Sequence, residues 1–89
     1  MKVYASASLT ASGQAGLGNA VYYGYTVTVV TATAAIFIRQ GSSTGQIIDV
    51  IPAATAAGAS KDRSLGIACT GGLFVDFNGA SGTVVILYE

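Results

Sequence analysis

The sequence predicts an all-β fold: a single antiparallel β-sandwich, jelly-roll-like, with about seven to eight short strands. Apolar and polar residues alternate with a period of two in several short runs, which is the pattern of half-buried strands. These runs are rich in Val, Ile, Thr, Tyr and Phe, and glycine-containing segments separate them. The 89 residues suit one small domain, so we expect a single sandwich over 1–89.

Seven runs carry the strand pattern. They lie at residues 2–9, 21–30, 34–39, 46–51, 65–69, 73–77 and 83–88. In the second run, strict alternation places one set of side chains on one face and a second set on the other: Tyr23, Tyr25, Val27 and Val29 against Tyr22, Gly24, Thr26 and Thr28. The last run is apolar on both faces. We therefore expect a strand that is central in its sheet or covered by a neighbouring subunit.

The segments between the runs have the composition of turns. Residues 11–19 carry three glycines and are expected to form a longer loop. Residues 70–72 and 78–82, the second beginning with Asn-Gly, favour tight hairpins. Residues 53–64 are rich in alanine but leave room for one helical turn at most, so we expect a crossover loop between the two sheets.

Charge is scarce in this chain. Four Lys and Arg residues balance four Asp and Glu residues, and charged residues make up only 9% of the sequence against 52% apolar residues. Soluble monomers have about a quarter charged residues and avoid zero net charge. The composition therefore predicts association with other protein. Four scattered cations do not form a basic stripe, so no nucleic-acid partner is expected.

Residues 20–38 lack charge and are long enough to cross a bilayer. Their threonines alternate with apolar residues, which indicates a strand instead of a lipid-facing helix, so no membrane partner is expected. The residues after Lys2 contain no continuous apolar segment of the kind found in signal peptides. We expect a chain that is made and assembled in the cytoplasm.

The inventory of reactive residues is small. The single cysteine, Cys69, cannot form an internal disulfide, and the absence of histidine excludes a Cys/His metal site. Cys69 also has no histidine to act as its base, so we interpret it as a small buried residue. No catalytic residue, metal or cofactor is expected.

The loop GSSTG at 41–45 raises the possibility of a phosphate cradle. A phosphate loop of the Walker type has four residues between its glycines, then Lys and Ser or Thr, then a helix. Here three residues separate the glycines, no lysine follows and the next run is strand-like. We therefore expect a hairpin loop, with Arg39 and Asp49 orienting strands.

Asp49 and Asp76 are candidates for a glycosidase-like pair of carboxylates. Each lies within an apolar alternating run, and by parity Asp49 shares a face with Ile47 and Ile51. We expect each aspartate to point outward, or to pair with Arg39 or with a turn amide.

Aromatic and charged residues supply candidates for a binding surface. The tyrosines could form a sugar-stacking platform, but tyrosines on successive strand positions are more typical of core and interface packing. Residues 60–64, SKDRS, are interpreted as a solvated loop tip, with a salt bridge to a neighbouring subunit as the alternative. The residues expected at a subunit interface are Tyr22, Tyr23, Tyr25, Val84, Ile86, Tyr88, Lys61, Asp62 and Arg63.

The segments AAIFIRQGSSTGQIIDVIPAATAAGAS and GGLFVDFNGASGTVVILYE resemble small virion proteins of tailed phages. The resemblance covers about residues 20–89 and rests on small and aliphatic residues. It implies a non-enzymatic β-sandwich that is assembled into a phage particle as a capsid decoration (cement) protein. It implies no catalytic residue.

From composition and resemblance together we expect a virion structural protein that contacts the major capsid protein, or another virion protein, and itself. Its oligomer would be symmetric, for example a homotrimer. The alternative is a small neck, tail or head-fibre component, or a carbohydrate-binding attachment module.

Overall fold

The computed structural model describes residues 5–16 and 18–89, and the side chains of all of these except Ala5, Arg63 and Ser64. Within this part of the chain there are eight strands and no helix. The strands are β1 (Ala5–Leu9), β2 (Gly13–Gly16), β3 (Ala20–Ala32), β4 (Ile36–Gln40), β5 (Ile47–Ile51), β6 (Ser60–Cys69), β7 (Leu73–Asp76) and β8 (Ser81–Tyr88).

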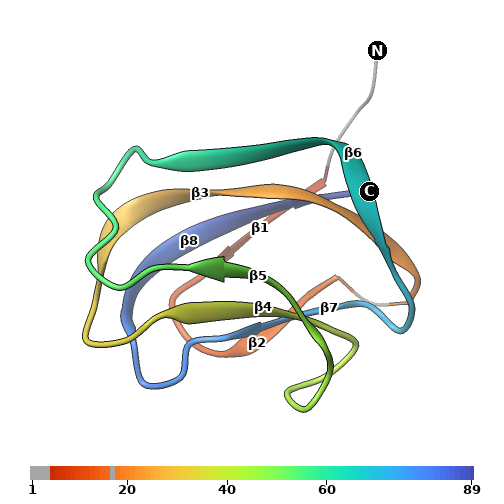
Figure 1. Cartoon of the computed structure of the whole chain (residues 1–89), viewed down its shortest axis with the longest axis horizontal. Coiled ribbons are helices and arrows are strands. Elements are labelled where there is room, and N and C mark those ends of the chain that lie inside the picture. Colours follow the sequence, from red (N-terminus) through yellow and green to blue (C-terminus); the bar gives the residue numbers. More distant parts are fainter. Residues whose placement is uncertain (1–4, 17) are drawn as a thin grey trace.

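The strands form two four-stranded sheets whose paired neighbours are all antiparallel. Sheet A has the order β1-β8-β3-β6 and sheet B the order β2-β7-β4-β5. The two sheets form the upper and lower layers in Figure 1. Successive strands change sheet at every connection except the β4–β5 hairpin, and this is the strand order of an eight-stranded jelly roll. The predicted all-β sandwich is confirmed.

The core lies between the two sheets. Alternate residues of β4, β7 and β8 point into it, as the period of a strand requires. The largest fully buried side chains are Tyr22, Ile36, Ile38, Ile51, Leu73, Ile86, Val27, Val75, Val84 and Thr31. Each large aliphatic side chain buried in this way contributes about 1.5–3 kcal/mol. The core is therefore built from positions two residues apart on both sheets.

Strand β3 departs from the strict alternation that its sequence predicts. Its register with β6 and β8 shifts between Tyr22 and Gly24, so that Tyr22 and Tyr25 both belong to the core. The bulge is possible because Gly24 has a φ of 137°, and a Cβ there would lie 1.9 Å from the carbonyl oxygen of Lys61. The predicted face with Tyr23 and Tyr25 side by side is therefore wrong.

Four connections also differ from the prediction. Residues 70–72 and 78–82, expected as tight hairpins, lie where the chain passes from β6 to β7 and from β7 to β8, and both passages cross from one sheet to the other. Residues 11–19, expected as loop, contain strand β2. The SKDRS segment, expected as a loop tip, forms the first half of strand β6 at the edge of sheet A. The hairpin at GSSTG and the crossover after Pro52 from sheet B to sheet A are confirmed. The last run was expected to be central in its sheet or covered by a neighbouring subunit. Strand β8 lies between β1 and β3, so it is central in its sheet.

Candidate functional site

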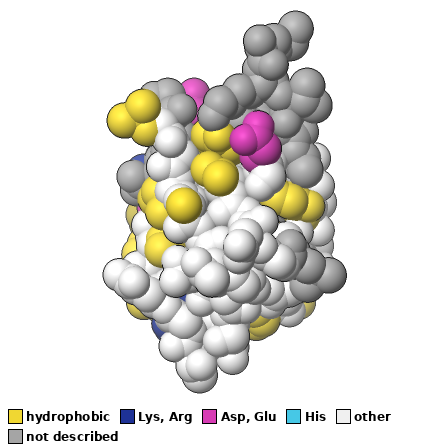
Figure 2. All heavy atoms as spheres, turned by 90° about the vertical axis from the view of Figure 1, so that its right-hand side faces the viewer, with side chains coloured by type: hydrophobic (Ala, Val, Ile, Leu, Met, Phe, Trp, Pro, Cys, Tyr) yellow, Lys and Arg dark blue, Asp and Glu magenta, His cyan; other side chains and the backbone are white. Residues whose placement is uncertain are grey.

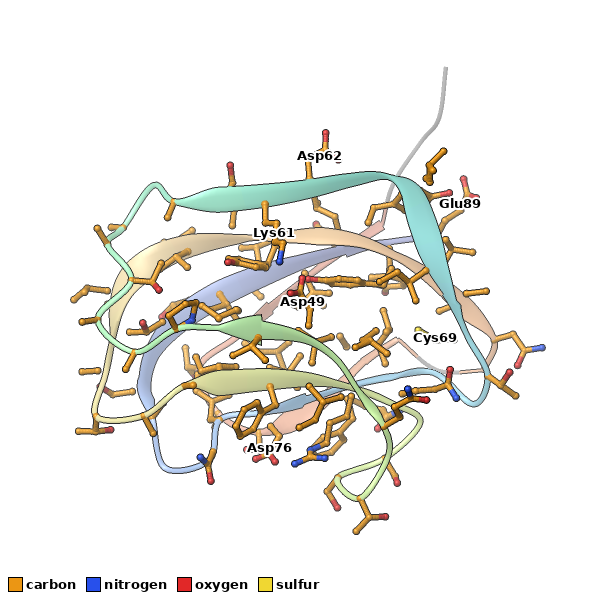
Figure 3. All side chains as sticks on the ribbon, in the orientation of Figure 1. Asp49, Lys61, Asp62, Cys69, Asp76 and Glu89 are labelled. Carbon is orange, nitrogen blue, oxygen red and sulfur yellow. The ribbon has the colours of Figure 1, made fainter. Side chains whose placement is uncertain are left out.

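The most deeply buried charged group of the described residues is Asp49, on β5. Its Oδ2 accepts a hydrogen bond of 2.8 Å from the hydroxyl of Tyr22 on β3, and its Oδ1 accepts one of 2.9 Å from Nζ of Lys61 on β6. The Asp49 side chain is 3% exposed, whereas that of Lys61 is 42% exposed. Figure 3 shows Lys61 descending from β6 toward Asp49 in the space between the layers. This set of three residues is called the inter-sheet cluster below.

The inter-sheet cluster joins two edge strands. Strands β5 and β6 are the outer strands of sheets B and A, and the Lys61–Asp49 ion pair connects them across the side of the sandwich. Asp49 Oδ1 also accepts a hydrogen bond of 2.9 Å from the backbone N–H of Val50 on the same edge strand. Inward-pointing charges are one way in which proteins protect sheet edges from pairing with other chains. Both carboxylate oxygens thus have structural partners.

The position of Asp49 corrects the parity argument made from the sequence. Asp49 and Ile51 are buried, while Ile47 is 41% exposed. The register of β5 with β4 shifts between Ile38 and Arg39, which breaks the alternation. Asp49 therefore points into the sandwich, contrary to the expectation of an outward residue.

Asp76 and Arg39 form a second ion pair, on the outer face of sheet B. Arg39 Nε lies 3.0 Å from Asp76 Oδ2, and the N–H of Asn78 donates to Asp76 Oδ1 over 3.0 Å. Arg39 Nη1 also donates to the carbonyl oxygen of Gly45 over 2.9 Å. The predicted pairing of Asp76 with Arg39 and a turn amide is confirmed. In Figure 3 Asp49 lies between the layers and Asp76 below sheet B, so the two carboxylates do not face a common cleft.

The GSSTG loop is held as a turn by its own backbone. The N–H of Gly45 donates to the carbonyl of Ser42, and the N–H of Gln40 donates to the carbonyl of Gln46. A Cβ at Gly45 would lie 1.7 Å from the oxygen of Gln40, so the turn needs glycine at this position. Strand β5 follows the loop where a phosphate site would need the N-terminus of a helix.

Cys69 is 2% exposed, and burial raises the pKa of its thiol above the ordinary value. This confirms its interpretation as a small buried residue. Its nearest polar partner is the carbonyl of Ile67, 3.5 Å from Sγ. Cys69 also lines a shallow depression of about 230 Å³ between the start of β3 and the end of β6, together with Asn19, Ala20, Val21, Ala68, Thr70 and Glu89.

The structure places most of the expected interface residues inside the chain itself. Tyr22, Val84 and Ile86 are fully buried, and Tyr23 and Tyr25 are 2% and 7% exposed. Because these side chains are covered by the chain's own strands, they are not available to a second subunit or to a sugar. The expectation of a subunit interface or a sugar platform built from them is corrected.

The remaining expected interface residues have mixed positions. Tyr88 is partly buried and packs against the core. Lys61 is exposed but bound to Asp49, and Asp62 is exposed on β6 opposite Gly24. The side chain of Arg63 lies outside the described residues, as does the whole of Tyr4. A role of Tyr88, Lys61, Asp62 and Arg63 at an interface stays a prediction.

The surface carries apolar residues that the sequence pattern did not single out. They are Val29, Val30, Ile47, Val50 and Leu65, which are 39–95% exposed. Leu65 is exposed because four residues of β6, at 63–66, stand opposite the single residue Tyr23 of β3. Irregular register of this kind cannot be read from alternation alone.

No helix of the described residues is long and apolar enough to cross a membrane. No group of three or more potential metal ligands is found in that part of the chain. Comparison of the chain with protein-family models, with curated proteins and with solved structures gave no match.

Proposed function

We propose that this protein is a non-enzymatic structural component of a virus particle, a capsid decoration (cement) protein. It binds the capsid surface through the major capsid protein, associates with itself as a symmetric oligomer, and stabilises the particle. Its location is the virion, which is assembled in the cytoplasm of the host. The observation that carries the proposal is the surface of the sandwich, where large apolar side chains stand exposed in a chain of very low charge.

The exposed apolar residues support association. Leu65 is 95% exposed, and Val29 and Val30 are about half exposed, at 51% and 50%. Together with a formal net charge of zero, such residues favour contact with other protein surfaces. Burial of apolar area stabilises a contact by about 25 cal/mol per Å².

The internal pairing of the polar residues also supports a structural role. Asp49 and Lys61 join two edge strands, and Arg39 and Asp76 join β4, β7 and the GSSTG loop. The candidates for acid–base chemistry therefore have roles in holding the sandwich together.

The fold and the sequence resemblance point in the same direction. Jelly rolls occur in viral capsid proteins and in lectins, and a fold alone does not define function. The resemblance of residues 20–89 to small tailed-phage virion proteins favours the capsid over the lectin. The burial of Tyr22, Tyr23 and Tyr25 removes the tyrosine platform on which a sugar-binding role would depend.

The test is to purify virus particles from cells that carry the coding sequence, and to measure the copies of this chain per particle and their position by electron microscopy. We expect many copies, arranged with the symmetry of the capsid, and particles without the protein should break at lower temperature. A few copies at one vertex would indicate a neck or tail component instead. Absence from the particle, or turnover of an ester, glycoside or phosphate that Asp49→Asn or Asp76→Asn abolishes, would refute the proposal.

A further inference from the structure

The chain contains two asparagines, and they differ in the residue that follows them. Asn78 precedes Gly79, whereas Asn19 precedes Ala20. Asn78 and Gly79 are exposed and lie in the connection from β7 to β8, at the left end of the sandwich in Figure 1. Asn19 lies just before β3 at the opposite end, which faces the viewer in Figure 2. The same side chain therefore occurs in two different surroundings.

Asn78 and Gly79 form the middle of a tight turn. The N–H of Ala80 donates to the carbonyl of Phe77 over 2.7 Å. The φ angle is 50° at Asn78 and 82° at Gly79. Positive φ at both central residues is typical of a type I′ turn, in which Asn followed by Gly is the preferred pair. The local sequence thus explains why this turn forms.

The peptide bond between Asn78 and Gly79 is anchored on both sides, but the groups that could react with each other are not. The N–H of Asn78 donates to Asp76 Oδ1 over 3.0 Å, and the carbonyl of Gly79 accepts from Thr33 Oγ1 over 3.0 Å. Within the part of the chain that the structure describes, neither the carboxamide of Asn78 nor the N–H of Gly79 has a hydrogen-bond partner. A Cβ at Gly79 would meet no atom within 4 Å. The nitrogen of Gly79 is therefore neither hydrogen-bonded nor shielded by a side chain.

We propose that Asn78 and Gly79 form a site of spontaneous covalent modification, at which the backbone nitrogen of Gly79 attacks Cγ of Asn78. The new N–Cγ bond closes a succinimide ring, the Cγ–Nδ2 bond breaks, and Nδ2 leaves as ammonia with the proton of the Gly79 amide. Water then opens the ring at one or the other of its carbonyls, which leaves an aspartate or an isoaspartate at position 78. Asparagine and water are consumed and ammonia is released, so the reaction needs no oxidant, metal or enzyme.

Proximity drives this reaction, because the attacking nitrogen and the carboxamide belong to neighbouring residues and the step is unimolecular. The hydrogen bond from Ala80 to Phe77 spans the turn and has to lengthen as the ring closes. Exposed turns open locally at little cost in free energy, so the folded chain reaches the reactive geometry without global unfolding. The chemistry does not depend on the proposed function.

Asn19 lies in surroundings that oppose the same reaction. Its Oδ1 accepts a hydrogen bond of 3.3 Å from the N–H of Gly71. The nitrogen that would attack belongs to Ala20, which is 6% exposed and stands opposite Cys69 in the pairing of β3 with β6. The methyl group of Ala20 and the strand pairing both keep this nitrogen away from Cγ. We therefore expect Asn19 to stay intact.

The modification changes both the turn and the charge of the chain. An isoaspartate adds a methylene group to the backbone between β7 and β8, so the bonds that Ala80 and Thr33 make in the turn cannot both be kept. The new carboxylate lies close to Asp76, and like charges repel. Because the formal net charge of the unmodified chain is zero, each event makes the chain negative. The product should therefore melt at a lower temperature and separate in isoelectric focusing.

The test is to incubate the purified, folded chain in mildly alkaline buffer and to follow it by peptide mass spectrometry and isoelectric focusing. We expect a gain of about 1 Da in the peptide that holds Asn78, together with isoaspartate and an acidic band. Gly79→Ala should slow the gain at least about tenfold, because the methyl group shields the nitrogen. Gly58→Ala is the matched control, since Gly58 also has a positive φ and no atom within 4 Å of its Cβ, and it should change the rate less than about twofold.

Asn78→Ser is a second variant, which removes the carboxamide without altering Gly79 and should abolish the gain. The proposal is overturned if the folded chain stays unmodified at Asn78 while the chain in urea reacts, because the turn would then protect its own asparagine. It is also overturned if Asn19 reacts as fast as Asn78, or if Gly79→Ala reacts at the wild-type rate.

Discussion

Removal of one oxygen atom, by the substitution Tyr22→Phe, tests the role of the inter-sheet cluster. The hydroxyl of Tyr22 donates to Asp49 over 2.8 Å, and the side chain is fully buried. Phenylalanine keeps the ring and its packing, so the main loss is the hydrogen bond. A hydrogen bond to a charged group contributes about 1.5–3 kcal/mol. We expect the free energy of unfolding to fall by about 2 kcal/mol.

The variant should still fold. A domain of this length has a free energy of unfolding of about 4–13 kcal/mol. Asp49 also keeps its bonds from Lys61 and from the N–H of Val50. A loss of about 2 kcal/mol corresponds to a decrease in Tm of about 8–16 °C for a domain of this size. Urea unfolding followed by circular dichroism should show a lower midpoint with an unchanged m-value.

Tyr25→Phe is the matched control. Tyr25 is 7% exposed, and its hydroxyl makes no hydrogen bond within the described residues. Its removal should change stability by less than about 0.5 kcal/mol. A double-mutant cycle of Tyr22→Phe with Asp49→Ala should give a coupling of at least about 1 kcal/mol. If Tyr22→Phe matched the wild type, or if the cycle gave no coupling, the reasoning about the inter-sheet cluster would be refuted.

Further predictions concern the bulge, the thiol and the outer ion pair. Gly24→Ala should lower the free energy of unfolding by more than about 3 kcal/mol, because the added Cβ would overlap a backbone oxygen. Gly58→Ala is the control: Gly58 also has a positive φ, but no atom lies within 4 Å of its Cβ, so the loss should be about 1 kcal/mol. Urea unfolding measures both losses. Cys69 should react with a disulfide reagent at a rate set by unfolding, and reaction of the folded chain as fast as in urea would contradict its burial. Burial raises the pKa of the Cys69 thiol in the folded state, so the folded chain holds the thiol proton more tightly than the unfolded chain does. The free energy of unfolding should therefore fall as pH rises from the ordinary thiol pKa toward the raised one. Cys69→Ser should remove this fall in a pH series of melting curves. Arg39→Met should lower stability by about 1 kcal/mol, since the ion pair to Asp76 is partly exposed, and an unchanged melting curve would show that the pair contributes nothing.

The strands were largely predictable because their side chains alternate where the backbone is regular. Strands β4, β7 and β8 follow the predicted runs to within two residues at either end, and the GSSTG hairpin needed only its glycines and the two flanking runs. Strand β2, with the sequence GQAG, was missed because two of its four residues are glycine and its pairing with β7 depends on residues far along the chain.

The inter-sheet cluster and the burial of the tyrosines were not predictable from alternation. One residue inserted into a strand moves every later side chain to the opposite face of the sheet. Gly24 does this in β3, and the shift near Ile48 does it in β5. A glycine inside an alternating run is the signal of such a bulge. It does not show on which side of the strand the extra residue falls.

The central place of β8 in sheet A has a consequence for the order in which the protein folds during its synthesis. Among the described strands, β1 pairs only with β8, with Ala5 opposite Tyr88. A nascent chain from which β8 has not emerged therefore has no partner for β1, and β3 has one open edge. Sheet A is completed only after residues 81–88 leave the ribosome. Its folding therefore depends on contacts between residues that are distant in the sequence, which makes it slow. A truncation that removes these residues would take out the middle of a sheet, and the shortened chain should aggregate.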